Sequence, residues 1–260
     1  MNISFNKNVL FVCLLMFGLT TWPSCSGKKT SPVVAGKTVV ATNSWTAAFA
    51  EAAGADNVVV LAPVEMIHPS EYELRPGDIK RLMDADIIIY AGYETMTERL
   101  KKGLNIPSEK LLQINTDYSY ASIEQSIMTI AKLLNAEDRA RRNLLEIKTT
   151  FEEGRKAVVE KKMFGKPVFV HRFQESIARE LGLTPVGVFG PAAPEAAAIA
   201  EISNKEVFMI LDNLHNPVGQ PFREVLKNKP YRQLLNFPGS KNTKTLTDVI
   251  RYNISQITSD

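Results

Sequence analysis

The chain has 260 residues, of which 45% are hydrophobic and 23% are charged, and its formal net charge is +3. A chain of this length can bury one or two hydrophobic cores. So small a net positive charge excludes the electrostatic footprint of a nucleic-acid-binding protein, and we expect no nucleic-acid partner.

The first segment of the chain is predicted to be an export signal. Residues Val9–Thr21 are apolar, but they are too few for the ~20 residues of a membrane-spanning helix. We expect residues 1–24 to be a signal peptide and residues 25–35 to be a polar tether. A small residue precedes Cys25, as in bacterial lipoprotein signals, so Cys25 is the predicted lipid-attachment site; the alternative is an ordinary cleaved signal peptide. Because the other cysteine, Cys13, lies in the segment that would be removed, no internal disulfide is expected.

Strands and helices are predicted to alternate in residues 36–118. The expected strands are Lys37–Thr42, Asn57–Ala62 and Asp86–Tyr90, and the expected helices are Ser44–Ala53 and Pro76–Met83. The third strand is apolar on both faces, as a central parallel strand should be. This alternation predicts an N-terminal α/β lobe, a parallel sheet covered on both sides.

The middle of the chain, residues 119–163, breaks the alternation. An amphipathic helix is predicted over Ile123–Leu134, and a second helical stretch from Asn135 to about Lys162 exceeds the usual helix length. No flexible Gly/Ser hinge interrupts it. We therefore expect a rigid helical connector and only a small hinge motion on ligand binding.

The alternation resumes in residues 164–260. Expected strands are Pro167–Val170, Thr184–Phe189 and Val207–Leu211, and expected helices are Phe173–Leu181, Pro194–Ile202, Pro221–Lys227 and about Thr245–Ile257. The predicted fold class is therefore α/β, with two lobes that contain parallel sheets and are joined by a long rigid helix.

The three histidines of the chain each follow a short apolar run that is predicted to be a strand. They are His68, His171 and His215. Ligands of open α/β sheets bind outside the carboxyl ends of the strands, and imidazole is the commonest protein metal ligand near neutral pH. The three positions predict one site built from both halves of the chain.

Two stretches resemble a known family. The first runs from His68-Pro69-Ser70-Glu71-Tyr72-Glu73-Leu74-Arg75-Pro76-Gly77-Asp78 into Ala85–Glu94, and the second is Val170-His171-Arg172-Phe173 followed by Leu181-Gly182-Leu183 and Val188–Pro191. They are similar to the metal-binding solute-binding proteins of bacterial ABC importers, which deliver zinc, manganese or iron to a membrane permease. The resemblance implies two α/β lobes joined by one backbone helix with the metal in the cleft between them. It places His68 and His171 at ligand positions.

The sequence departs from the family pattern at two expected ligands. The family's second histidine is absent from Gln113–Tyr120, and Asn236 stands where the family has an acidic ligand. We predict His215 as a substitute ligand and Glu94 or Asp117 as the source of the carboxylate. Three imidazoles and one carboxylate would suit zinc, and manganese or iron accepts similar sets. Weaker cleft candidates are Tyr93, Arg172 and Asn213.

The predicted function is that of an exported, lipid-anchored receptor on the periplasmic or extracellular face of the envelope. It would bind a divalent metal, zinc or manganese, as cargo between the lobes and pass it to an ABC permease, as a monomer held to the membrane by the lipid on Cys25. The alternative is the same fold with a degenerate metal site, which would bind a metal chelate or a cobalamin- or haem-like ligand, or act as an adhesin. A metal-dependent hydrolase is a third class, but no nucleophile elbow, phosphate loop or dinucleotide motif occurs, and we expect no enzyme activity.

Overall fold

Two four-stranded parallel sheets form the framework of residues 36–259, which is the part of the chain that the computed structural model describes. The predicted signal peptide, tether and lipid-attachment residue Cys25 fall in residues 1–35, outside the described residues. Among the helices of the described part, none is long and apolar enough to cross a membrane.

The N-terminal sheet has the strand order β2-β1-β3-β4, and all of its pairs are parallel. Its strands are β1 (Thr38–Ala41), β2 (Asn57–Val60), β3 (Ile87–Tyr90) and β4 (Leu111–Gln113), and its main helices are α1 (Ser44–Ala52) and α2 (Pro76–Asp84). Asn43 starts α1, because its side chain accepts hydrogen bonds from the backbone N–H groups of Trp45 and Thr46. Helix α2 has Pro76 in its first turn, where the missing N–H is harmless.

The C-terminal sheet repeats this order as β6-β5-β7-β8. Its strands are β5 (Pro167–His171), β6 (Thr184–Phe189), β7 (Met209–Asn213) and β8 (Tyr231–Leu234), with helices α5 (Glu175–Glu180), α6 (Ala196–Ile202) and α7 (Gln220–Val225). In both sheets the chain order reverses next to the first strand, at β1/β3 and at β5/β7. Such switch points leave a crevice at the carboxyl ends of the strands.

Short helical turns complete the two lobes. They are η1 (Pro69–Glu71), the π-helical turn η2 (Arg99–Gly103), η3 (Ser108–Lys110) and η4 (Arg172–Gln174). Turn η1 directly follows His68, and turn η4 directly follows His171, the last residue of β5.

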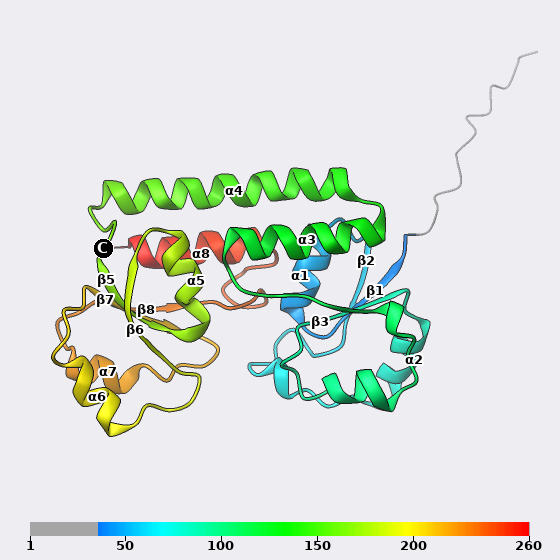
Figure 1. Cartoon of the computed structure of the whole chain (residues 1–260), viewed down its shortest axis with the longest axis horizontal. Helices are drawn as coiled ribbons and strands as arrows, with labels where there is room; N and C mark the ends of the chain where they lie inside the picture. The colour runs from blue at the N-terminus through cyan, green and yellow to red at the C-terminus, as the bar shows by residue number, and fades with distance from the viewer. Residues whose placement is uncertain (1–35, 260) are drawn as a thin grey trace, which may run out of the picture. The chain divides into compact units, whose positions relative to one another are not determined.

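A layer of three helices covers one side of both sheets (Figure 1). They are α3 (Tyr120–Leu134), α4 (Glu137–Glu160) and α8 (Leu246–Thr258). Helix α3 ends at Asn135, which adopts a left-handed conformation with φ of 54°, so the predicted connector consists of two helices. The 24-residue α4 extends above both sheets and packs against α3 and α8.

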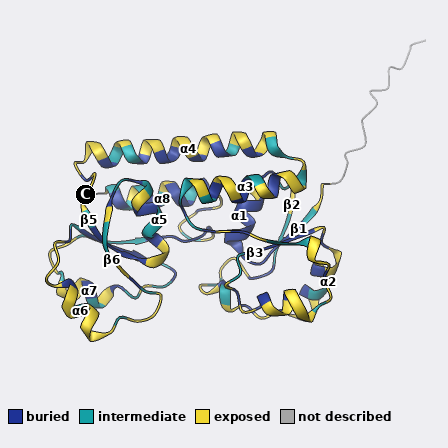
Figure 2. Ribbon diagram, in the orientation of Figure 1, coloured by how far each residue is buried: buried dark blue, intermediate teal, exposed yellow. Residues whose placement is uncertain are grey.

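One hydrophobic core continues beneath this layer from one sheet to the other. It joins Val39 of β1 to Val170 of β5 through Tyr118, Ile147 of α4 and Ile250 of α8. Figure 2 shows the central strands, such as β3 and β5, mostly buried and the outer side of α4 exposed. Two smaller cores fill the opposite faces of the two sheets. Because the lobes share one core, they form a single compact unit, Gly36–Asp260.

The segment after His68 is held by a buried carboxylate. The hydroxyl of Tyr72 donates to Oδ2 of Asp78 at 2.7 Å, and the backbone N–H of Arg75 donates to the same atom at 2.9 Å. Asp78 is buried, so an alanine would leave both donors without their acceptor. We expect Asp78→Ala to lower the free energy of unfolding by about 1–3 kcal/mol in equilibrium urea denaturation. Asp84→Ala in the same helix, at an exposed site, should stay within about 0.5 kcal/mol of wild type, and equal losses would contradict this assignment.

Candidate functional site

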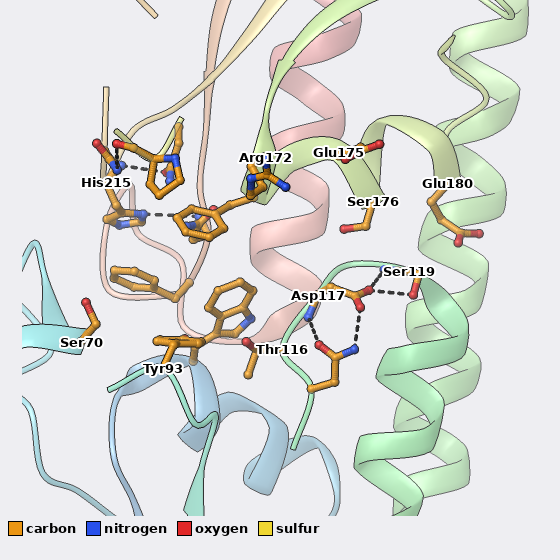
Figure 3. Close-up of a pocket in the computed structure, with 18 of the residues that line it drawn as sticks. Ser70, Tyr93, Thr116, Asp117, Ser119, Arg172, Glu175, Ser176, Glu180 and His215 are labelled. Atoms are coloured by element: carbon orange, nitrogen blue, oxygen red, sulfur yellow. Dashed lines mark hydrogen bonds between the residues drawn. The ribbon is translucent and has the colours of Figure 1, made fainter. Parts of the chain in front are cut away.

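A cavity of about 1330 Å³ lies between the two lobes, and its walls come from both of them (Figure 3). Its lining includes Trp45, Ile67, His68 and Tyr93 from the N-terminal lobe, Asp117 from the segment before α3, and Arg172, Phe173, Asn213, His215, Asn236 and Phe237 from the C-terminal lobe. Arg172 and Asn213 follow or end the strands β5 and β7, so the cavity lies at the carboxyl ends of parallel strands, where α/β folds bind ligands.

His215 is fixed in the cavity wall by two backbone contacts. Its N–H donates to Oδ1 of Asn213 at 3.0 Å, and its Nδ1 accepts from the N–H of Asn236 at 3.3 Å. Its ring stacks on Phe237 with the centroids 3.8 Å apart. Burial, with a smaller contribution from the charge of His68, lowers the pKa of His215 to about 4. The imidazole is therefore neutral at pH 7, and because Nδ1 accepts, the proton resides on Nε2.

His68 reaches the same cavity from the opposite lobe. It lies on the loop before η1, is exposed, and lines the cavity wall. Its charge contributes to the lowered pKa of His215. The structure thus brings two of the three predicted histidines to one cavity.

His171 does not line this cavity. It ends β5, is fully buried, and packs between Phe173 and Phe189, with ring centroids 5.1 and 5.5 Å away. Its Nδ1 accepts from the N–H of Phe173 at 3.2 Å, and its Nε2 has no hydrogen-bond partner among residues 36–259. A Cβ on Gly190, whose φ is +72°, would lie 2.4 Å from that Nε2. Within the described residues, His171 is therefore not assembled with His68 and His215 into a group of three ligand side chains.

The two candidate carboxylates lie in different environments. Glu94 is buried away from the cavity and accepts hydrogen bonds from the Thr42 hydroxyl at 2.6 Å, the Asn43 amide at 3.2 Å and the Gly92 N–H at 2.7 Å. These bonds tie the ends of β1 and β3 together and occupy both carboxylate oxygens.

Asp117 lines the cavity as an ionised group. Burial works to raise its pKa, but hydrogen bonds from Ser119, Ser122 and Asn115 outweigh burial and hold the pKa of Asp117 below its usual value. The N–H and the hydroxyl of Ser119 each donate to it at 2.7 Å. Asp117 is therefore ionised at neutral pH, with Oδ1 held by Ser119 and Oδ2 accepting from the Asn115 amide at 2.8 Å.

Asn236, which replaces the expected acidic ligand, joins the cavity wall to three other segments. Its Oδ1 accepts from Nε2 of Gln174 at 2.5 Å, and its carbonyl oxygen accepts from the Tyr118 hydroxyl at 2.7 Å. Its backbone N–H donates to Nδ1 of His215. Across residues 36–259, no group of three or more His, Cys, Asp or Glu side chains is arranged to hold a metal ion. The ligand roles of His68, His171, His215, Glu94, Asp117 and Asn236 remain predictions.

An aromatic wall is the part of the site that the sequence did not reveal. The rings of Trp45 and Tyr118 stack with centroids 5.5 Å apart, and Trp45 lies 6.4 Å from Phe237, which in turn stacks on His215. These residues come from α1, the segment before α3, and the segment after β8. No spacing in the sequence links three such distant aromatic residues.

One curated protein and several solved structures are similar to this chain. No protein-family model matches the sequence. The chain is 35% identical over 138 residues to the metal ABC transporter substrate-binding lipoprotein SloC of Streptococcus mutans, a match that covers 51% of this chain and 41% of that protein. The match thus spans about two fifths of the curated relative.

Solved structures share the fold over almost their whole length. The solute-binding protein FpvC of Pseudomonas aeruginosa, in complex with Mn²⁺, superposes with a TM-score of 0.70 at 17% identity, over 86% of this chain and 97% of that one. The Mn-bound periplasmic metal-binding protein of Candidatus Liberibacter asiaticus gives a TM-score of 0.61 at 16% identity, over 85% and 98%. The predicted fold class and the resemblance to the metal-binding solute-binding proteins are confirmed.

Proposed function

We propose that this protein is the extracytoplasmic solute-binding lipoprotein of an ABC importer. It captures a divalent metal in the cavity between its lobes and delivers it to a membrane permease, and it catalyses no reaction. The observation that carries this proposal is that His68 and His215, from different lobes, line one cavity together with the ionised Asp117. Further support comes from the relative named as a metal ABC transporter substrate-binding lipoprotein and from the fold shared with Mn-bound proteins.

Zinc and manganese are the proposed metals. Imidazole and carboxylate oxygen together suit zinc, and manganese accepts the same ligand types. His215 is uncharged at neutral pH, so its ring requires no deprotonation before it binds a metal. An importer receptor must also release its cargo, and a partial set of protein ligands favours release.

The proposed location is the outer side of a membrane, with export directed by residues 1–24. Attachment through a lipid on Cys25 would keep a monomeric receptor close to its permease. The support is the lipoprotein description of the Streptococcus mutans relative.

The test is metal binding by the purified protein, measured by titration calorimetry with Zn²⁺ and Mn²⁺. We expect the double variant His68→Ala/His215→Ala to bind at least about tenfold more weakly than wild type, because two imidazoles leave the cavity. Glu153→Ala, at an exposed position of α4, is the matched control and should bind as wild type does. Equal affinities of wild type and the double variant would refute His68 and His215 as ligands.

A second candidate is the same receptor with its metal carried in an organic complex. Two observations favour it. Within the described residues no set of three ligand side chains is assembled, and Nδ1 of His215 already accepts a backbone hydrogen bond. In addition, a cavity of about 1330 Å³ is at least as large as the ~300–1,000 Å³ that small-molecule pockets usually have, and one ion fills little of it.

A further inference from the structure

Exposed apolar side chains gather around the cavity. Ile67 is 63% exposed, Tyr93 54%, Phe164 64% and Phe173 40%, and all four line the cavity. Single exposed apolar residues are ordinary on protein surfaces, whereas a group of them at one concavity marks a binding site for apolar or aromatic groups. A metal ion held by imidazole and carboxylate makes no use of such a rim.

Among the charged residues of the lining, Arg172 has no carboxylate partner, and Glu71 and Asp117 have no cationic partner within the described residues. Arg155 is paired with Glu180 at 2.6 Å, and Arg179 with Glu175 at 2.7 Å. Arg172 is exposed, lines the cavity, and forms no ion pair with any of the residues in the described part of the chain. Figure 3 shows it at the start of the short turn that follows β5. A guanidinium without an ion-pair partner can donate several N–H hydrogen bonds to the acid group of a ligand.

The imidazole of His215 adds a hydrogen-bond donor. Because Nδ1 accepts from the Asn236 N–H, the neutral ring carries its proton on Nε2. To bind a metal through Nε2, the ring would have to move that proton and lose the backbone hydrogen bond. In this tautomer the ring can donate a hydrogen bond through Nε2 to an anionic oxygen of a ligand.

We propose that the cargo enters this cavity as an anionic complex of the metal with an aromatic chelator. Arg172 binds the acid groups of the chelator, and the apolar rim with Trp45 and Phe237 packs against its ring. This inference rests on the proposed function, in which the cavity is the cargo site. The chelator fills most of the coordination shell, so the protein needs few ligands of its own.

The test compares three probes by titration calorimetry on the full chain carrying Trp22→Phe. The probes are Zn²⁺ alone, the dianionic complex of zinc with two dipicolinates, and the dicationic complex of zinc with two bipyridines. The substitution leaves Trp45 as the sole tryptophan, and Trp45 lines the cavity, so its emission reports whether a probe binds there. We expect the dipicolinate complex to bind at least about tenfold more tightly than either other probe, because only it makes a charge-assisted pair with Arg172.

Two variants test separately the contribution of the Arg172 charge and that of the Phe173 ring to binding. Arg172→Gln should weaken binding of the dipicolinate complex by at least about tenfold without weakening binding of the bipyridine complex, and Phe173→Ala should weaken both complexes. Arg141→Gln, at an exposed position of α4, is the matched control. Unchanged binding of the dipicolinate complex to Arg172→Gln would overturn the inference.

The results also distinguish this inference from the proposed function. If Zn²⁺ alone binds tightly and the dipicolinate complex does not, the inference fails and the metal-receptor function stands. If none of the three probes binds, both fail. If the dipicolinate complex binds without changing the emission of Trp45, the complex binds outside the cavity and the inference fails.

Discussion

Replacing Gly154 with leucine is expected to destabilise the protein by about 3 kcal/mol, because the helical layer has no space for a side chain there. Gly154 is buried in α4. A Cβ at this position would lie 2.6 Å from Cδ1 of Ile254 in α8 and 2.8 Å from Cδ2 of Leu181, just after α5. A side chain at this position would therefore displace buried side chains of α8 and of the segment that ends α5. Equilibrium urea denaturation measures the loss.

Gly77→Leu is the matched control, because Gly77 also lies in a helix but has open space around it. A Cβ there would meet nothing within 4 Å. Leucine has the higher helix propensity, so this variant should match wild type or gain up to about 1 kcal/mol. If both glycine variants changed stability by the same amount, the close packing at Gly154 would be refuted.

The buried strands could be predicted from the sequence because parallel strands covered on both faces are apolar throughout. All four residues of β3, Ile87–Tyr90, are buried, and they formed a clear run. The edge strands β4 and β8 were missed. Strand β4 has three residues, none fully buried, and β8 contains Arg232 and Gln233, so neither shows an apolar run. A half-exposed edge strand is fixed by its neighbour in the sheet more than by its own composition.

The helical periodicity predicted which faces would be buried but not which partners they would have. The restart near Asn135 is a real break, where the chain turns with a positive φ between α3 and α4. The final helix was also predicted, but its position beneath α4 was not. Several helices could cover the same apolar face, and only the complete fold decides between them.

The position of the histidines after predicted strands indicated part of the cavity lining. A cavity lies at the carboxyl ends of the strands, where the sequence predicted a site, and His68 and His215 both line it, while their ligand roles stay predictions. Their position in the sequence could not show the direction of the His171 ring, which the contacts with Phe173 and Phe189 determine. It also could not show that nearby backbone and side-chain donors already occupy Glu94.

Asn253→Ala is expected to lower the free energy of unfolding by about 2–4 kcal/mol, because it leaves two buried backbone groups without partners. Asn253 of α8 is fully buried. Its Nδ2 donates to the carbonyl of Leu235 at 2.9 Å, and its Oδ1 accepts from the N–H of Leu235 at 2.7 Å. The Asn253 side chain thus supplies the two backbone hydrogen bonds that Leu235, just after β8, does not receive from a neighbouring strand.

The same pair of hydrogen bonds positions the cavity wall, because Leu235 immediately precedes Asn236 and Phe237. Without Asn253, the Leu235 amide should exchange its hydrogen faster, by an amount set by the loss of local stability, and the stacking of Phe237 on His215 should weaken. Hydrogen exchange at Leu235 and ligand affinity are the measurements, and Ser255→Ala, exposed on the same helix, is the control. Undiminished protection of the Leu235 amide in Asn253→Ala would contradict this role. A joint loss of protection and affinity would mean that α8, although it lies outside both sheets, holds the cavity in its binding geometry.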